Sequence, residues 1–302
     1  MSAEQKTDWD DLRIFLAVAR GESLSGAGRI LGLDPATVGR RIARLETAMG
    51  VRLFLRSSQG YGLTSAGQQL LAHAMRAEEA VAQAMHDLGA SDTGLSGQIR
   101  VGAPDGCANF LLPQVVAGIC DEHPGLEVQI VALPRVFNLS KREADMAIAV
   151  SPPAAGHLIV QKLTDYRLSL AAARSYLDRH PPIRSVGDLR HHRTIGYIRD
   201  MIFDPELDYQ SEVGMESVQM ASNSVSVQFN WVRTGAGVAV VHDFALPAAP
   251  DLVRILPDQV SLRRSFYLIR HPDDRRVERF NRFAELLAQG IRREVARLEG
   301  LA

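Results

Sequence analysis

Residues 23–46 read SLSGAGRILGLDPATVGRRIARLE, and this stretch decides the first domain of the chain. Two short helices that meet at Gly32-Leu33 have the form of a helix-turn-helix. Asp34 is expected to cap the second helix, and Pro35 suits its first position because the missing N–H has no helical partner there. The apolar residues of the second helix recur at helical spacing and are predicted to pack inward: Val38, Ile42 and Leu45.

The outer face of this second helix is predicted to read DNA. Arginine can fork onto guanine or clamp a phosphate in the major groove, so we expect base contacts from Thr37, Arg40 and Arg41. Pro35 and Ala36 would lie at the tip that faces the groove. A solvated helix face is the alternative, but the glycine turn, the Asp-Pro start and the small residues of the first helix favour DNA. The other predicted DNA contacts are Ser23, Ser25, Arg44, Arg52, Arg56 and Gln59.

A short hairpin is predicted directly after the second helix. Residues 53–64, LFLRSSQGYGLT, alternate apolar anchors with a glycine-bearing turn, which is typical of a small β-wing. The whole chain has a formal net charge of −1, which argues against a surface that binds polyanions everywhere. Between residues 29 and 56, however, six arginines face only Asp34 and Glu46. This local excess is the electrostatic footprint that a DNA-binding module needs.

The run from Trp9 to Gly67 resembles the winged helix-turn-helix of LysR-type transcriptional regulators. The matching pieces are DLRIFLAVA (11–19), SLS (23–25), TVGRRI (37–42), LE (45–46), GVRLF (50–54) and LTSAG (63–67). Length and layout match that family over essentially the whole chain. The resemblance implies a homodimer or homotetramer that bends double-stranded DNA, with RNA polymerase as a candidate partner. It also implies a small-molecule effector, of a kind that the sequence does not identify, and no cofactor.

One long helix is predicted over residues 65–88, with an apolar stripe close to a heptad repeat. The small N-terminal module is not expected to bury this stripe, so we predict pairing with the same helix of a second subunit; packing within the chain is the alternative. Such a dimer places two recognition helices on an inverted-repeat operator. The predicted domains are therefore a winged helix-turn-helix (1–64), a dimerisation helix (65–88), a glycine-rich hinge (89–97) and an effector-binding domain (98–302).

Alternating strands and helices after residue 97 predict an α/β sheet with crossover connections. We expect one helix over 110–122, a helix-prone segment over 139–144, separate strands over 158–163 and 166–173, and a closing helix from Arg275. The resemblance implies two Rossmann-like subdomains, as in periplasmic binding proteins, joined by strands that cross near 162–167 and 264–268. Subdomain one would be 98–163 plus 268–302, and subdomain two 166–265.

Ligands of open α/β sheets bind beyond the carboxyl ends of strands, near helix N-termini. Segments 103–107, 150–152 and 222–224 meet that description, and the family puts its effector in the cleft between subdomains. Ordinary capping is the alternative, and for Ser222 and Asn223 it is equally expected. The resemblance suggests a small acid or a semialdehyde as the effector. Because Asp105 is an unsuitable neighbour for an organic anion, an amine or a polyol remains an alternative. The predicted effector contacts are Asp105, Gly106, Cys107, Arg135, Ser151, Tyr197, Phe203, Ser222, Asn223 and Ser224.

Other functional classes find less support in the sequence. Two cysteines make no disulfide framework, the N-terminus has no apolar signal region, and no apolar run reaches membrane-spanning length, so a cytoplasmic protein is expected. An enzyme is disfavoured because the phosphate-loop, nucleophile-elbow and zinc-protease motifs do not occur. His191-His192 has no partners at metal spacing. A redox sensor using Cys107 and Cys120 remains an alternative, although Cys120 lies on an apolar helix.

Overall fold

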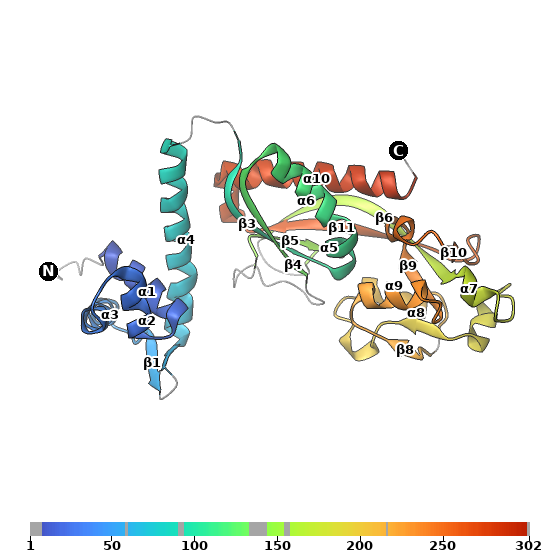
Figure 1. The fold of residues 1–302 in the computed structure, drawn as a ribbon, viewed down its shortest axis with the longest axis horizontal. Coiled ribbons are helices and arrows are strands. Elements are labelled where there is room, and N and C mark those ends of the chain that lie inside the picture. The colour runs from blue at the N-terminus through green and yellow to red at the C-terminus, as the bar shows by residue number, and fades with distance from the viewer. Residues whose placement is uncertain are drawn as a thin grey trace. The chain divides into compact units, whose positions relative to one another are not determined.

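The structure, a computed structural model, describes residues 8–57, 60–89, 94–132, 144–153, 158–215 and 217–300. The chain divides into two compact units, Met1–Thr93 and Gly94–Ala302 (Figure 1). Each unit has its own apolar core, so we describe each by itself.

Unit 1 is a three-helix module with a two-stranded wing and a long final helix. Its core joins Phe15 of the first helix to Val38 and Leu45 of the third, and the ring of Phe15 lies 5.3 Å from that of Phe54 in the wing. The strands of the wing are antiparallel, as predicted. The elements are α1 (Trp9–Gly21), α2 (Leu24–Leu31), α3 (Pro35–Met49), β1 (Phe54–Ser57), β2 (Gly60–Leu63) and α4 (Ser65–Gly89).

The turn between α2 and α3 forms for the reasons that the sequence suggested. The Asp34 side chain accepts a hydrogen bond of 2.8 Å from the Ala36 N–H, and Pro35 is the first residue of α3. Gly32 ends α2 with φ 66°, a left-handed conformation that glycine adopts without strain. A Cβ on Gly28 would lie 2.5 Å from the Leu33 carbonyl oxygen, so only glycine lets the turn pack this closely. The helix-turn-helix prediction is confirmed.

Helix α4 covers the predicted range, but part of its stripe packs within the chain. Ala74 is buried in the core of unit 1, and Leu70 and Leu71 pack against that core. The expectation that the module leaves this stripe uncovered is therefore wrong for these turns. A helix of this length spans roughly 37 Å, and Glu78, about midway along it, pairs with Arg20 of α1. Farther along, Val81 is 46 % exposed.

Unit 2 is built around one mixed sheet that carries helices on its faces (Figure 1). Its strands are β3 (Ser96–Ala103), β4 (Gly125–Ala132), β5 (Met146–Ala149), β6 (Ile159–Ala173), β7 (Thr194–Gly196), β8 (Met220–Ala221), β9 (Val238–His242), β10 (Leu252–Arg254) and β11 (Ser261–Arg270). Its helices are α5 (Asp105–Phe110), α6 (Leu112–Glu122), α7 (Arg174–Leu177), α8 (Tyr209–Glu212), α9 (Val225–Arg233) and α10 (Glu278–Leu298). Short 3-10 turns are η2 (Val186–His191), η3 (Arg199–Met201), η4 (Pro205–Leu207), η5 (Asp243–Ala248) and η6 (Pro272–Arg276).

Two long strands join the halves of this sheet. The strand order is β4-β3-β5-β11-β6-β9-β7-β8, with β10 also paired to β6. Strands β3, β4 and β5 are parallel in one half, and β7, β8 and β9 are parallel in the other. Between them β6 and β11 run antiparallel, and Tyr166 pairs with Arg264 where the halves meet. The prediction of an α/β domain with two halves joined by two crossing strands agrees with this sheet, while the exact subdomain bounds stay a prediction.

Some predicted boundaries in unit 2 are wrong. The helix expected over 110–122 is α6, which begins two residues later, at Leu112, and the short helix α5 before it was not predicted. Pro113 separates the two helices because it has no N–H with which to continue the first one. The two strands expected over 158–173 are one strand, β6, because Asp165 finds partners in Lys162, Ser265 and Arg263 and no turn is needed. The closing helix begins at Glu278 after η6. Most of the segment expected as a helix over 139–144 lies outside the described residues.

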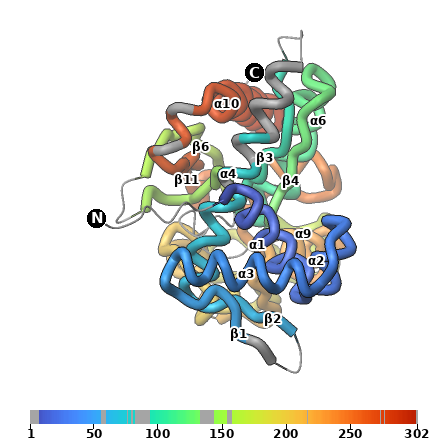
Figure 2. Tube along the Cα trace, turned by 90° about the vertical axis from the view of Figure 1, so that its left-hand side faces the viewer, coloured from blue at the N-terminus to red at the C-terminus, as the bar shows by residue number. Residues whose placement is uncertain are grey.

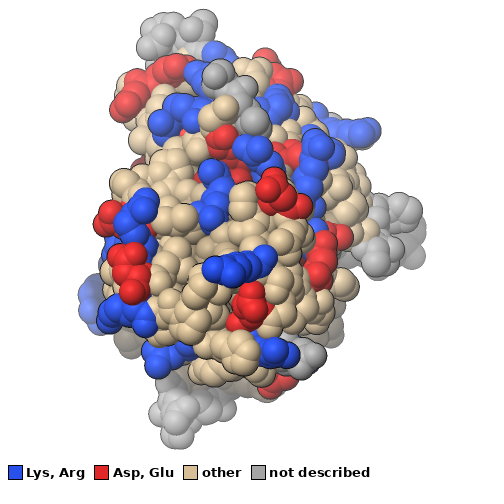
Figure 3. Space-filling view, turned by 90° about the vertical axis from the view of Figure 1, so that its right-hand side faces the viewer, with Lys and Arg blue, Asp and Glu red and all other residues tan. Residues whose placement is uncertain are grey.

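The surface charge of the molecule is mixed on the side where α7 and β10 lie. Figure 3 shows Lys and Arg alternating there with Asp and Glu rather than gathering by sign. In the described ranges, no helix combines the length and the apolar character that crossing a membrane requires. Within the same ranges, no cluster of three or more His, Cys, Asp or Glu side chains is arranged to hold a metal ion.

Candidate functional site

The outward face of α3 is a row of exposed residues at helical spacing. Val38, Ile42 and Leu45 are buried beneath it. Arg40 lies in the middle of the exposed row, and its Nη2 donates a hydrogen bond of 3.2 Å to Thr37 Oγ1 rather than to a carboxylate. Figure 2 shows unit 1 from the side of α3, with α3 in front and the β1–β2 wing below it. The row consists of Ala36, Arg40, Ala43 and Thr47.

Two predicted contact residues of α3 are instead held by acids of α1. Arg41 Nη1 lies 3.0 Å from Asp11 Oδ1, and Arg44 donates to both carboxylate oxygens of Asp11 at 2.7 Å. Asp11 is 3 % exposed, whereas Asp8, which also pairs with both arginines, is half exposed. DNA contacts by Arg41 and Arg44 would therefore compete with ion pairs inside unit 1, while Arg40 has no such competitor among the described residues.

The remaining predicted DNA-binding residues lie around α3. Pro35 and Ala36 are exposed at its N-terminus, and Ser25 is exposed on α2. Ser23 caps α2 by accepting a hydrogen bond of 3.0 Å from the Gly26 N–H, so its side chain has a structural task. Arg52 is exposed just before the wing. Gln59 and the side chain of Arg56 lie outside the described part of the structure.

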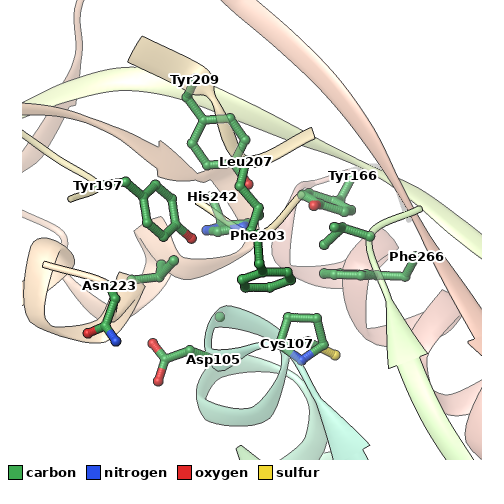
Figure 4. Close-up of a pocket in the computed structure, with 14 residues that line it drawn as sticks. Asp105, Cys107, Tyr166, Tyr197, Phe203, Leu207, Tyr209, Asn223, His242 and Phe266 are labelled. Carbon is green, nitrogen blue, oxygen red and sulfur yellow. The ribbon is translucent and has the colours of Figure 1, made fainter. Parts of the chain in front are cut away.

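Unit 2 contains a small, partly open cavity where the two halves of its sheet meet. The cavity has a volume of about 20 Å³, room for roughly one water molecule. Its walls come from the start of α5, the strands β6, β9 and β11, the segment 197–209 and the start of α9 (Figure 4). Six of the predicted effector contacts line it: Asp105, Gly106, Cys107, Tyr197, Phe203 and Asn223.

Asp105 links the two subdomains across this cavity. Its Oδ2 accepts hydrogen bonds from the Ser226 N–H at 2.8 Å and from Ser224 Oγ at 3.1 Å, both at the N-terminus of α9. Its Oδ1 accepts from Asn109 Nδ2 at 3.2 Å. A carboxylate at a helix N-terminus is stabilised by the helix dipole and by free amide groups. A side chain of subdomain one thus caps a helix of subdomain two.

Aromatic rings form most of the cavity wall. Tyr166 stacks on Phe266 with ring centroids 4.1 Å apart, and its ring also stacks on His242 at 5.4 Å. Burial raises the pKa of Tyr166, Tyr197 and Tyr209 above the usual phenol range. The hydroxyl groups of Tyr166 and Tyr209 are close enough to affect each other's pKa, yet neither makes a hydrogen bond of normal geometry within the described structure.

His242 at the end of β9 is buried and neutral at pH 7. Burial lowers its pKa to about 4, against an opposing effect of the nearby Asp105. Its Nδ1 has no hydrogen-bond partner among the residues that the structure describes. A Cβ on Gly106 would lie 3.0 Å from the His242 ring, so the ring rests on the backbone of α5. The cavity therefore offers a ligand unused polar atoms inside an aromatic shell.

Three other predicted effector contacts are described and are not among the residues that line the cavity. Ser224 Oγ accepts from the Val227 N–H and caps α9, and Ser222 Oγ accepts from the Ser224 N–H in the turn before the helix. Ser224 nevertheless holds Asp105. Ser151 donates a hydrogen bond to Asp204 outside the lining set. Arg135 lies outside the described residues.

Sequence reasoning missed several lining residues, although two signals pointed to some of them. His242 ends a buried strand, which is the criterion that selected the other segments. Tyr166 and Phe266 lie on the predicted crossing strands. An aromatic side chain on such a strand points to one face of the sheet or the other at the place where the subdomains meet. Leu207 and Tyr209 carried no such signal. Pro104 and Val150 lie within segments that the sequence indicated, although neither was named as a contact. The missed residues are Tyr166, Leu207, Tyr209, Val225, His242 and Phe266.

The two cysteines lack the features of a reactive pair. Cys107 is fully buried, and burial raises the pKa of its thiol far above the usual range. Burial, and then the neighbouring Asp121, also raise the pKa of Cys120. Peroxide-sensing cysteines are activated by a lowered pKa, because the thiolate is the nucleophile. These surroundings speak against the redox alternative.

Comparison with known proteins gives matches along nearly the whole chain. Residues 9–68 match the family described as "Bacterial regulatory helix-turn-helix protein, lysR family", and residues 92–292 match "LysR substrate binding domain". The regulator DgdR of Burkholderia cepacia is 31 % identical over 244 residues, which cover 79 % of each chain. The activator TtdR of Escherichia coli is 26 % identical over 269 residues, 87 % of each chain. The solved structure of CrgA, a LysR-type regulator of Neisseria meningitidis, superposes with a TM-score of 0.57 at 23 % identity, covering 95 % of this chain and 99 % of that one.

Proposed function

The chain belongs to the LysR family of transcriptional regulators, and from that premise we propose which of its residues bind DNA and which bind the effector. It is a DNA-binding regulator with an effector-binding domain. Unit 1 is the DNA-binding part and unit 2 holds the effector in its cavity. The exposed row on α3 with Arg40 at its centre is the observation that carries the first assignment.

In this proposal α3 enters the major groove and Arg40 contacts base edges. Arginine is the side chain that most often contacts guanine, because its guanidinium can donate two parallel hydrogen bonds to O6 and N7. Thr37, Pro35 and Ala36 lie beside it at the exposed start of the helix. Ser25 and Arg52 contact the phosphates that flank the groove. Arg41 and Arg44 contact phosphates only if the negative charge of the DNA backbone breaks their ion pairs with Asp11.

Two copies of the chain are proposed to bind one inverted-repeat operator through their paired α4 helices. The exposed side chains of Met75 and Val81 on α4 support this, since apolar surface on a long helix is stabilised by a partner. Pairing of two such dimers gives the tetramer expected for the family. Occupancy of the cavity in unit 2 changes how the subdomains close and shifts which quaternary arrangement is populated. We propose that this takes place in the cytoplasm, without turnover of the ligand.

The first test is an anisotropy titration of the full-length protein against labelled DNA that flanks its own gene, with unlabelled competitor DNA present. Arg40→Ala is expected to weaken binding to the specific site by roughly 10- to 100-fold, because one base-reading arginine contributes about 1–3 kcal/mol. Arg190→Ala removes the same charge from an exposed position in unit 2 and is the matched control. Equal affinity of Arg40→Ala and the wild type would refute the assignment of α3 as the reading helix.

A further inference from the structure

The charge of the cavity in unit 2 comes from one side chain. Among the described residues that line it, Asp105 carries a formal charge at pH 7, and the others are apolar, aromatic or neutral. His242 is neutral because burial lowers its pKa to about 4. No lysine or arginine is among these lining residues. The cavity therefore presents a negative charge to whatever enters it.

Asp105 keeps this charge uncompensated by any described cation. Its hydrogen-bond donors are the Ser226 N–H, Ser224 Oγ and Asn109 Nδ2, and all three are neutral. An ionised carboxylate offers about four acceptor positions, so these three bonds leave roughly one position for a ligand. Within the described structure no ion pair joins Asp105 to a basic side chain. A ligand with a hydrogen-bond donor and a positive charge would fill the free acceptor position of Asp105 and neutralise its charge.

Three hydrogen-bond donors at the start of α9 are already occupied, while Val225, whose N–H begins the helix, lines the cavity. The Ser226 N–H is occupied by Asp105, and the Val227 N–H by Ser224 Oγ. The Ser224 N–H just before the helix is occupied by Ser222 Oγ. A carboxylate ligand at this helix start would have to remain beside Asp105, with two like charges in a low-dielectric site. This helix start therefore disfavours the acids that helix N-termini usually attract.

The walls of the cavity suit a cation with an apolar body. Figure 4 shows Phe203 in the middle of the cavity, with Tyr197 on one side of it, above Asp105, and with Tyr166 and Phe266 on the other. The faces of such rings attract ammonium groups, and their area buries apolar groups. Nδ1 of His242, which has no partner in the described structure, can bond a second polar group of the ligand.

Entry of such a ligand requires the cavity to widen. The present volume of about 20 Å³ suits roughly one water molecule. Among the described rings that line the cavity, Phe203 is the half-buried one, on the segment between the turns η3 and η4, whereas the other rings are buried. Its displacement gives space without disturbing the stack of Tyr166 on Phe266. An amine can thus replace the Phe203 ring while the hydrogen bonds of Asp105 to α9 remain.

We propose that the effector of this regulator is a small primary amine with an apolar body, whose ammonium group binds Asp105 and whose body lies among the aromatic rings of the cavity. This rests on the proposed function, since it assumes that the cavity of unit 2 is the effector site. It narrows the open classes of acid, semialdehyde, amine and polyol to one. It also makes Asp105 the residue that determines specificity by charge.

The test compares probes of the same shape and opposite charge. Full-length protein is titrated calorimetrically with butylamine and phenethylamine, and with butyrate and 3-phenylpropionate. We expect each amine to bind at least ~10-fold more tightly than the acid of the same shape, because a hydrogen bond to a charged group adds to the charge attraction. Asp105→Asn keeps an acceptor for the Ser226 N–H and should abolish that preference. Asp105→Glu keeps the charge and should retain it.

Asp121→Asn removes an exposed aspartate of unit 2 and is the matched control, which should leave the amine preference unchanged. Tighter binding of the acids, equal binding of both series, binding of neither, or an amine preference that survives Asp105→Asn would overturn the proposal. Operator binding is measured on the same samples. A protein that binds its operator but prefers no amine refutes this inference alone, whereas a protein that binds no operator refutes the proposed function.

Discussion

Asp11 shows how one buried residue can set the charge that α3 presents to DNA. It is 3 % exposed and pairs with Arg41 and Arg44, two of the arginines on which the sequence-based DNA prediction relied. A helical pattern places these arginines outside the core, but it does not show the acid of α1 that lies against them. The positive charge available from α3 is therefore smaller than its arginine count suggests.

Asp11→Asn is expected to free Arg41 and Arg44 for phosphates. Each arginine that gains a phosphate contact steepens the dependence of log affinity on log salt by roughly 0.9, so the variant should bind non-specific DNA more tightly at low salt and show a steeper slope. Anisotropy titrations between low and physiological salt measure it. Asp10→Asn, an exposed acid of the same helix, is the control. A slope equal to that of the wild type would show that the ion pairs do not limit DNA binding.

His242 should make the stability of unit 2 depend on pH. The folded protein holds the pKa of His242 at about 4, below its ordinary value of 6.5. Between these values the unfolded chain binds a proton that the folded chain does not, so stability falls as pH drops from 6.5 toward 4 and loses nothing more below that. Between pH 7 and 4.5 this amounts to about 2 kcal/mol.

The measurement compares denaturant unfolding of the wild type and of His242→Phe at those two pH values. Trp231 reports on unit 2 when Trp9 is replaced by phenylalanine in both proteins, because the chain has two tryptophans, one in each unit. The wild type should lose more stability on acidification than the variant. The same loss in both would mean that His242 is readily protonated in the folded protein.

At the scale of elements, α4 divides into two parts with different tasks. Its first turns bury Ala74 and pack Leu70 and Leu71 on unit 1, and its Glu78 pairs with Arg20 of α1. Beyond them Val81 is exposed. The first part of the apolar stripe of α4 therefore packs within the chain. The part that is available to a partner subunit is shorter than the whole helix.

Val81→Glu is expected to weaken self-association, because it places a charge in the apolar surface that would meet a second α4. Sedimentation velocity over a range of protein concentrations should show a larger monomer fraction, with operator binding reduced in parallel. Gln69→Glu introduces the same charge at an exposed position near the start of α4 and should have little effect. Unchanged sedimentation of Val81→Glu would move the dimer contact elsewhere.

For the whole molecule, two separate cores imply two separate unfolding transitions. Phe15 and Leu45 belong to one core, and Tyr166 and Phe283 belong to the other. Cooperative unfolding follows the residues that share a core, so each unit should respond to substitutions of its own.

Gly28→Ala tests this independence. The added Cβ would meet the Leu33 carbonyl at 2.5 Å, so unit 1 should lose roughly 1–3 kcal/mol, the usual penalty of overpacking. Gly62→Ala adds a Cβ with no atom of the described structure within 4 Å and is the matched control. With Trp231 replaced by phenylalanine, Trp9 fluorescence should report the loss; with Trp9 replaced instead, Trp231 should report none. A shift of both transitions would show that the units unfold together.

The sequence by itself determined the helix-turn-helix, the wing, the long helix and the alternating α/β pattern, because each depends on local spacing, caps and turns. Asp34, Pro35 and Gly32 act within a few residues of their own position. Such local signals can therefore be recognised from the sequence alone. It also indicated Asp105, Cys107 and Asn223 together, and these residues line one cavity, since the carboxyl ends of strands converge in any open sheet.

The tertiary structure alone decided which side chains meet across distant segments. Asp11 reached Arg41, Asp105 reached the start of α9, and Tyr166 stacked on Phe266 through packing between elements far apart in the chain. These contacts depend on the register of β6 against β11 and on the orientation of whole helices. Such quantities are set by the three-dimensional closure of each core, and no periodicity in the sequence encodes them.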